Sequence, residues 1–357
     1  MAVLDPRADV VDLTAALCDI RSESGDEAEI ADAIEAVLRA QPHLTVDRDG
    51  DAIVARTNAG RARRVAVAGH IDTVPIRDNV PSRRANVNGV DTLIGRGTVD
   101  MKGGVAVQLV LAAALAEPSS DVTWIFYDHE EVDTTLNGLG RISRNRPDLL
   151  AADFAVLCEP TNAIVEGGCN GTARVLLRYH GVRAHSARPW VGRNAIHGAA
   201  TAFSTLADWV PTEVEVDGLV YRESLNAVGM SGGVAGNVIP DLAEVTINYR
   251  FAPSRSRDAA IDHLRELFPD AELVVQDVAE GARPGLDAPA AKEFLAAVGG
   301  TAMPKYGWTD VARFSALGIP AVNYGPGDPM RAHTDDEAVA VEEIRSCERG
   351  LRAWLSS

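Results

Sequence analysis

The stretch that decides the fold is Val65-Ala66-Val67-Ala68-Gly69-His70-Ile71-Asp72-Thr73-Val74-Pro75. Its first four residues are an apolar run that predicts a buried strand, and a histidine and an acid follow where that strand ends. Residues i and i+2 of a strand share a face, so Asp72 can hold the ring nitrogen of His70 that a metal would leave free. The stretch therefore predicts one corner of a metal site.

Three further segments repeat this pattern of an apolar strand or its loop followed by an acid. They are the glycine-rich loop 95–104 with Asp100, the segment 124–131 ending in Glu130 and Glu131, and the segment 155–160 with Glu159. Far downstream, the segment 332–337 adds His333. Open α/β sheets keep their ligand sites at the ends of strands, so these side chains are expected to meet.

The number and type of these side chains suit two metal ions. One histidine, one bridging carboxylate and one terminal carboxylate satisfy one zinc, and a second set that shares the bridge satisfies another. This leaves room for a water between the ions. Five ligands therefore suffice for a di-zinc centre.

With these motifs in this order, the chain resembles the zinc-dependent aminoacylase and carboxypeptidase family of amidohydrolases, from about Leu13 to the C-terminal helix. The resemblance implies two Zn²⁺ ions, for which Co²⁺ can substitute. It implies the following ligands: His70 and Glu159 on one zinc, Glu131 and His333 on the other, and Asp100 bridging both.

The resemblance also implies hydrolysis of an amide bond by a metal-activated water. Glu130 would be the general base, and Asp72 would orient His70. Simpler interpretations stay open. Glu130 and Glu131 could be a solvated pair, Asp100 could cap the following helix, and Glu159 could belong to a turn before proline. The other histidines without such surroundings are expected to be surface or packing residues: His43, His129, His180, His197 and His263.

Two other motifs in the sequence lack the context that their usual functions need. Residues 229–233 fit Gly-x-Ser-x-Gly but lack the strand before and the helix after that a nucleophile elbow needs, so they are interpreted as a glycine-rich strand entry. The loop 95–104 lacks the Gly-Lys-Ser/Thr ending of a phosphate-binding loop. A His-Glu-x-x-His helix is absent from the sequence, which argues against a thermolysin-like protease.

Composition indicates a soluble enzyme. A chain of 357 residues exceeds what one core usually supports, so two domains are expected. The formal charge of -17 disfavours nucleic acid or an anionic membrane as a partner. Residues 1–6 give no sign of a signal peptide. The cysteines show no CxxC spacing and no disulfide framework, which favours the cytoplasm: Cys18, Cys158, Cys169 and Cys347.

The order of elements predicts an α/β protein of two domains. Residues 7–40 have a helical period broken near Ser24, and strands alternate with helices up to about Gly171, which indicates a mixed, largely parallel sheet. The family resemblance implies that this sheet is like that of zinc exopeptidases. From Thr172 a β-α-β-β-α order predicts an inserted, ferredoxin-like α+β domain with four strands and two helices. Because His333 follows the insertion, the catalytic domain is discontinuous: 1–171 with 286–357, around 172–285.

The resemblance gives the inserted domain a role as lid and dimerisation domain. It implies a homodimer in which His185 enters the partner's active site, where its N–H would stabilise the oxyanion of a tetrahedral intermediate. A solvated loop histidine is the alternative for His185.

Finer details resemble the bacterial desuccinylase branch of the family, namely residues 137–140, 166–172 and 185–194. This implies hydrolysis of N-succinyl-LL-2,6-diaminopimelate to succinate and LL-2,6-diaminopimelate. The positions matching substrate contacts are Asn237, Arg250, Thr309 and Arg313. Arg250 could instead be a salt-bridged strand residue and Asn237 a turn residue, and residues 308–312 depart from the Ser-Asp-Gly of many relatives. An N-acetylornithine deacetylase, another N-acyl-amino-acid hydrolase or dipeptidase, or a scaffold that has lost catalysis are the alternatives.

Overall fold

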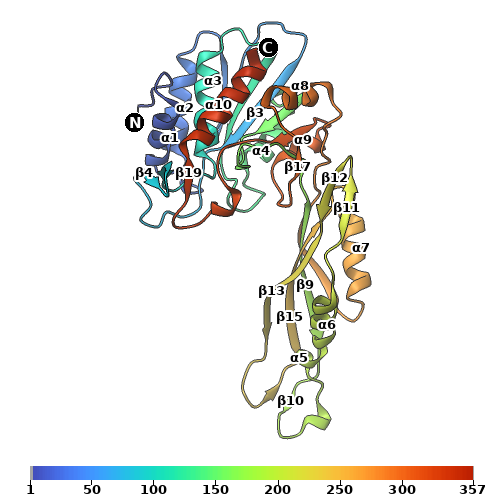
Figure 1. Ribbon diagram of the computed structural model, residues 1–357. Coiled ribbons are helices and arrows are strands. Elements are labelled where there is room, and N and C mark those ends of the chain that lie inside the picture. The colour runs from blue at the N-terminus through green and yellow to red at the C-terminus, as the bar shows by residue number, and fades with distance from the viewer. Residues whose placement is uncertain (1–2, 357) are drawn as a thin grey trace. The chain divides into compact units, whose positions relative to one another are not determined.

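The computed structural model describes residues 3–356, which form two compact units (Figure 1). Unit 1 comprises the residues up to Gly167, Pro284–Met303 and those from Arg313 onward. Unit 2 comprises Gly168–Arg283 and Pro304–Ala312. The insertion expected from the sequence, 172–285, differs from the observed 168–283 by a few residues at each end. The sequence also assigns residues 304–312 to the catalytic domain, whereas the structure groups them with unit 2. Within residues 3–356, none of the helices combines the length and apolar character needed to cross a bilayer.

Unit 1 is built on an eight-stranded sheet in the order β1-β2-β6-β3-β7-β18-β8-β17. The four central strands β6, β3, β7 and β18 are parallel, and β1, β2 and β8 are antiparallel to their neighbours. This is the mixed α/β sheet that the sequence predicts. The strands are β1 (Thr45–Asp49), β2 (Ala52–Arg56), β3 (Arg64–His70), β6 (Asp121–Tyr127), β7 (Phe154–Leu157), β8 (Glu166–Gly167), β17 (Met303–Pro304) and β18 (Ala321–Asn323).

The central strands are apolar along their length because helices cover the sheet. Every residue of β6 and β7 is buried. Helix α3, which follows the glycine-rich loop, packs against α1 and α10 and is buried along nearly its whole length (Figure 1). The helices outside the inserted region are α1 (Val10–Asp19), α2 (Ala28–Arg39), α3 (Lys102–Ala114), α4 (Gly138–Asn145), α8 (Pro289–Val298), α9 (Val311–Ala316) and α10 (Val341–Ser356).

Unit 2 has a four-stranded antiparallel sheet in the order β13-β15-β9-β16. Together with the succession of elements along the chain, this is the ferredoxin-like arrangement that the sequence predicts. One side of the sheet packs its alternate apolar residues into a core of its own with the helices. The elements are β9 (Gly171–His180), α5 (Ala195–Gly198), α6 (Ala200–Asp208), β13 (Ser224–Gly232), β15 (Leu242–Phe251), α7 (Arg257–Leu267) and β16 (Glu272–Ala279).

Three smaller sheets complete the fold. In unit 2, a hairpin joins β11 (Glu213–Val216) to β12 (Leu219–Arg222), and a short ladder joins β10 (Ala184–His185) to β14 (Val238–Ile239). In unit 1, β4 (Arg83–Val87), β5 (Val90–Ile94) and β19 (Ala338–Ala340) form a three-stranded sheet. The glycine-rich residues 229–232, interpreted from the sequence as a strand entry, are the second half of β13.

Candidate metal centre

His70 is the last residue of β3 and is buried at the carboxyl end of the parallel strands. Its Nδ1 lies 3.0 Å from the main-chain oxygen of Asp72 and 3.4 Å from its Oδ1, and its Nε2 lies 3.1 Å from Oδ1 of Asp100. Burial lowers the pKa of His70, but the Asp100 and Asp72 carboxylates outweigh burial and raise this pKa well above its usual value. One ring nitrogen is therefore oriented by Asp72 and the other faces a carboxylate.

Asp100 lies between two histidines. Its Oδ1 faces His70, and its Oδ2 lies 3.2 Å from Nε2 of His333, which is also 2.9 Å from Oε1 of Glu131. Ligand atoms of His70, Asp100 and Glu131 all lie within 4.8 Å of one another. The Asp100 side chain does not cap α3, whose N-cap is Met101. A carboxylate with one histidine at each oxygen has the arrangement of a bridging ligand, so the donor set fits a two-metal site.

The two histidines differ in burial and share the Asp100 carboxylate. His333 is 54% exposed, and hydrogen bonds with Asp100 and Glu131 raise its pKa to about 10. Burial would raise the pKa of Asp100, but its contacts with His333 and His70 hold it well below the usual value. Metal ions bind the neutral imidazole, so a bound metal would replace protons at these two rings.

Glu159 follows β7, the strand next to β3 in the sheet. Ala68 pairs with Leu157, and the main-chain N–H of Cys158 donates to the oxygen of Ala68. Continuing this register places Glu159 beside His70, with a spacing of about 5 Å between adjacent strands. Glu159 is buried, which suits a carboxylate that serves as a terminal ligand.

Asp72 also holds the backbone of the two glutamates, a contact to which no sequence motif points. Its Oδ1 and Oδ2 accept the main-chain N–H groups of Glu130 and Glu131, each at 3.0 Å, and its Oδ2 also accepts the Ser24 hydroxyl at 2.6 Å. Burial raises the pKa of Asp72, but the contacts with His70 and these donors lower it to about 2. One buried carboxylate thus positions both glutamates as well as His70.

The turn that carries the two glutamates is also held from the N-terminal segment. His129 has a φ of +58°, and its N–H donates to Oε1 of Glu27 at 3.2 Å. Its Nδ1 lies 2.9 Å from Asp128. From the sequence, His129 is expected to be a surface or packing residue. No local motif links Glu27 to His129, so only the fold reveals the contact.

A further buried acid, Glu337, contacts the loop that carries Asp100. The carboxylate accepts the main-chain N–H groups of Val99 and Asp100 and pairs with Arg96 at 2.6 Å. Burial raises the pKa of Glu337. This residue ends the run 332–337 that carries His333, and that position was its only signal in the sequence.

The expected substrate residues lie in both units. In unit 2, Nδ1 of His185 accepts the N–H of Ala187, and the main-chain oxygen of Asn237 accepts the N–H of Ser186. His185 ends β10 and Asn237 directly precedes β14, so the two residues adjoin each other. Arg250 and Thr309 are set apart from them. Arg250 pairs with Thr172 and Ser224 at the other end of the four-stranded sheet, and Thr309 is buried with its main-chain oxygen 3.7 Å from Cys169 Sγ.

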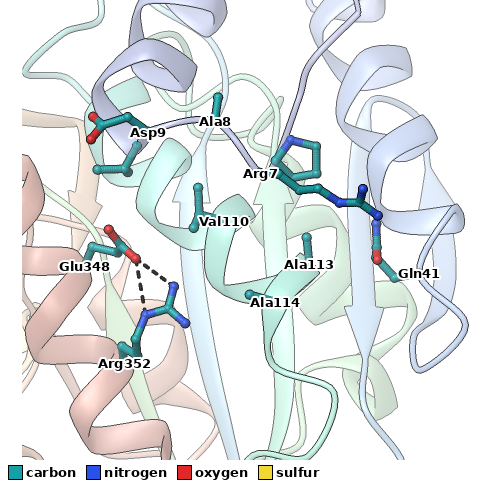
Figure 2. Close-up of a pocket in the computed structure, with 11 residues that line it drawn as sticks. Arg7, Ala8, Asp9, Gln41, Val110, Ala113, Ala114, Glu348 and Arg352 are labelled. Atoms are coloured by element: carbon teal, nitrogen blue, oxygen red, sulfur yellow. Dashed lines mark hydrogen bonds and ion pairs between the residues drawn. The ribbon is translucent and has the colours of Figure 1, made fainter.

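Arg313 belongs to unit 1, where its guanidinium donates to the Thr134 hydroxyl at 2.7 Å. A separate pocket of about 430 Å³ in unit 1 contains none of the predicted site residues (Figure 2). It lies beside α3 and α10, and the Glu348–Arg352 ion pair occupies one wall. The metal centre, and not this pocket, is therefore the candidate functional site.

Residues 66–357 match the model of the peptidase family M20/M25/M40. The chain belongs to this family. It is 55% identical, over 99% of both chains, to a putative succinyl-diaminopimelate desuccinylase of Mycobacterium tuberculosis. It is 48% identical to a succinyl-diaminopimelate desuccinylase of Corynebacterium glutamicum, covering 99% of this chain and 98% of that one.

Solved structures of other proteins share the fold at lower identity. A tripeptidase of Staphylococcus aureus superposes with a TM-score of 0.79 at 19% identity, covering 99% of this chain and 98% of that one. A dinuclear metal-binding peptidase of Bacillus subtilis superposes with a TM-score of 0.72 at 18% identity, covering 97% and 96%. The expected fold, an α/β unit with an inserted α+β unit, is confirmed.

Proposed function

We propose that this protein hydrolyses the amide bond of N-succinyl-LL-2,6-diaminopimelate to succinate and LL-2,6-diaminopimelate. The observation that carries this proposal is the 55% identity, over 99% of both chains, with a putative succinyl-diaminopimelate desuccinylase. The cluster of two histidines and acidic side chains at the strand ends supports the same reaction class, because it supplies the donors of a two-metal hydrolase. The buried, free cysteines suit a reducing cytoplasm as its location.

We propose two zinc ions as the cofactor, with Co²⁺ as a substitute. His70 and Glu159 would hold one ion, Glu131 and His333 the other, and Asp100 both. The contacts of Asp100 with a different histidine at each carboxylate oxygen support this assignment. When bound, the ions supply Lewis-acid polarisation of the amide carbonyl and lower the pKa of a coordinated water.

The protein's own side chains then divide the remaining work. Glu130 takes the proton from the attacking water and delivers it to the leaving amine. The main-chain N–H groups of Glu130 and Glu131 both donate to Asp72, which fixes the backbone that carries the two carboxylates. His185 donates to the carbonyl oxygen as negative charge develops there. Because its Nδ1 accepts the N–H of Ala187, its proton resides on Nε2 and is available for donation.

Substrate carboxylates would bind to cationic and amide side chains. Arg250 suits this role because its guanidinium contacts Asn248 Oδ1, and within residues 3–356 no carboxylate lies within ion-pair distance of it. Burial without such a partner lowers the pKa of Arg250. A desolvated arginine without a counter-ion gains most from a bidentate carboxylate ligand. Asn237, Thr309 and Arg313 are the other proposed contacts.

The layout of unit 2 supports a site shared between two chains. His185 and Asn237 adjoin one end of its sheet, where β9 ends, and Arg250 lies where β9 begins. A ten-residue strand is about 30 Å long, which exceeds the reach of one small substrate. His185 and Arg250 can therefore serve the same substrate only when they come from different chains of a homodimer.

Strand β13 offers the surface for that homodimer. It is an edge strand, and its residues from Asn226 onward are exposed, including Val228 at 61% and Met230 at 49%. An exposed apolar edge strand is a template for pairing with a second chain. Pairing of β13 with its counterpart would be symmetric, as expected of a twofold dimer.

Hydrolysis of N-succinyl-LL-2,6-diaminopimelate by metal-stripped protein titrated with zinc tests this function, with N-acetylornithine as the parallel substrate. Zinc-dependent release of succinate, with little release of acetate, is the expected result. Preference for N-acetylornithine would overturn the substrate and keep the chemistry. If neither substrate reacts at saturating zinc, the proposed hydrolase function is wrong.

A further inference from the structure

Glu337 is a fully buried acid just before β19. Its Oε1 accepts two main-chain N–H groups, from Val99 at 2.9 Å and from Asp100 at 3.0 Å. Its Oε2 accepts from the buried guanidinium of Arg96 at 2.6 Å. The carboxylate is thus satisfied on both oxygens, and one of them holds the backbone of the residue proposed to bridge the two ions.

The same residue fixes the loop that delivers His333. The main-chain N–H of Gly95 donates to the oxygen of Glu337 at 2.9 Å, and the next residue, Ala338, pairs with Ile94 in the ladder between β19 and β5. Residues 334–336 connect this anchor to His333, which reaches Asp100 and Glu131. Glu337 therefore ties together the two loops that carry Asp100 and His333.

Asp100 and His333 depend more on the surrounding loops for their positions than His70 does. His70 is the last residue of a central strand, whereas Asp100 lies in the loop before α3 and His333 is half-exposed with a φ of +66°. Loop ligands depend on the hydrogen bonds around them for their geometry. The carboxylate of Glu337 is a buried side-chain contact that couples the loop of Asp100 to the loop of His333.

We propose that Glu337 is a positioning residue of the metal centre, which sets the separation of Asp100 and His333 and thereby the affinity for the ion that these two residues share with Glu131. This inference rests on the proposed metal-dependent function. It predicts that loss of the Glu337 carboxylate contacts weakens the binding of that ion about 10- to 100-fold, the range observed when partners of metal ligands are removed.

Two variants test the positioning role of Glu337. Glu337→Gln keeps the side-chain volume but turns an amide N–H toward either the backbone donors or Arg96, and Glu337→Asp keeps the charge but withdraws the carboxylate by one methylene group. Asp121→Asn is the matched control, because Asp121 is also a buried acid that accepts main-chain N–H groups, from Ala59 and Arg61, at the opposite end of β6.

The measurement is a zinc titration of each metal-stripped protein against a chromophoric chelator, with Co²⁺ absorption as a second readout and circular dichroism to establish folding. We expect one of the two zinc-binding steps to weaken about 10- to 100-fold in both Glu337 variants, together with an altered Co²⁺ spectrum, and Asp121→Asn to match the parent. Unchanged zinc binding in folded Glu337 variants, or an equal loss in Asp121→Asn, would overturn the inference. If the parent binds no zinc, the metal-dependent function itself is wrong.

Discussion

At the scale of single residues, a substitution of Glu130 tests proton transfer without removing a proposed metal ligand. Glu130→Gln removes the proton acceptor but keeps the main-chain N–H that donates to Asp72, so the turn should stay in place. We expect turnover to fall at least about 100-fold, the usual share of a general base, while zinc content stays at the parent value. Steady-state kinetics beside metal analysis checks this. Turnover near that of the parent would show that another group takes the proton.

The Asp121 carboxylate is expected to stabilise the folded state through its hydrogen bonds. Its oxygens accept the N–H groups of Ala59 and Arg61 and the hydroxyl of Thr57. Burial raises the pKa of Asp121, but these donors outweigh burial and hold it below the usual value. Such a group contributes stability above its unfolded pKa of about 4, and the contribution is lost as pH falls through the lower folded value.

We therefore expect Asp121→Asn to reduce the free energy of unfolding by about 1–3 kcal/mol at pH 7, because its amide group would face a main-chain N–H. The difference from the parent should persist to about pH 5 and shrink below about pH 4. Urea unfolding at several pH values measures it. The exposed Asp270→Asn is the control, and a difference that grows on acidification would contradict the assignment.

At the residue level, the sequence predicted a contact where a motif places a histidine and an acid at the end of a strand. The i, i+2 spacing of His70 and Asp72 predicted their contact, and the two side chains do meet. Glu27 and Glu337 carried no such signal, because each acts on main-chain N–H groups far away in the chain. Main-chain donors are present at every residue other than proline, so a sequence does not reveal which of them a distant acid will hold.

At the scale of elements, α3 approaches the chain closely at Cys158, the residue between the end of β7 and Glu159. A Cβ on Gly104 would lie 2.2 Å from the main-chain oxygen of Cys158. Gly104→Ala should therefore push α3 away from Cys158 and destabilise the protein by about 1–3 kcal/mol or more, with weaker zinc binding as a second effect.

Thermal unfolding and zinc titration of the Gly104 variant measure both effects. Gly198 in α5 provides the control, because a Cβ there would meet Tyr179 at an ordinary 3.7 Å. We expect Gly198→Ala to have little effect or to be slightly stabilising, since alanine favours helix over glycine by up to about 1 kcal/mol. Equal behaviour of the two variants would show that the close approach at Gly104 relaxes freely.

The sequence predicted the helices and strands well where the pattern of apolar residues is long and regular, and poorly where the strands are only three or four residues long. The helical period over 7–40 and its break near Ser24 correspond to α1 and α2, and the β-α-β-β-α order of unit 2 is present. The hairpin of β11 and β12 was not predicted, because four-residue strands with exposed positions give little periodicity. The three-residue strand β18 lies too far along the chain from β7 for local patterns to reveal that the two pair.

At the scale of the whole molecule, the exposed edge of β13 makes dimerisation testable. Met230→Lys places a charge on that edge, a substitution that commonly blocks edge pairing. We expect a monomer by sedimentation velocity, with activity lost and zinc binding retained. Val220→Lys, on the separate hairpin strand β12, is the control and should leave the dimer intact. A dimeric Met230→Lys would place the interface elsewhere.

The shared site can be tested by mixing two inactive variants. His185→Ala and Arg250→Ala should each be nearly inactive, but a mixed dimer has one site with both residues intact. Random reassortment makes about half the dimers mixed, with one good site of two, so about a quarter of parental activity should return. Activity measured after mixing and refolding checks this. No recovery, with mixed dimers demonstrated, would mean that each site uses residues of one chain.

The position of β18 in the sheet has a consequence for biosynthesis. This strand pairs with β7 in the middle of the unit 1 sheet, yet it is translated only after the entire inserted unit. While the ribosome is still making residues 168–283, the apolar edge of β7 has no neighbour on that side. Unit 2, whose β9, β13, β15 and β16 all lie within that stretch, can form its sheet first. The nascent chain would therefore benefit most from chaperone protection during this interval.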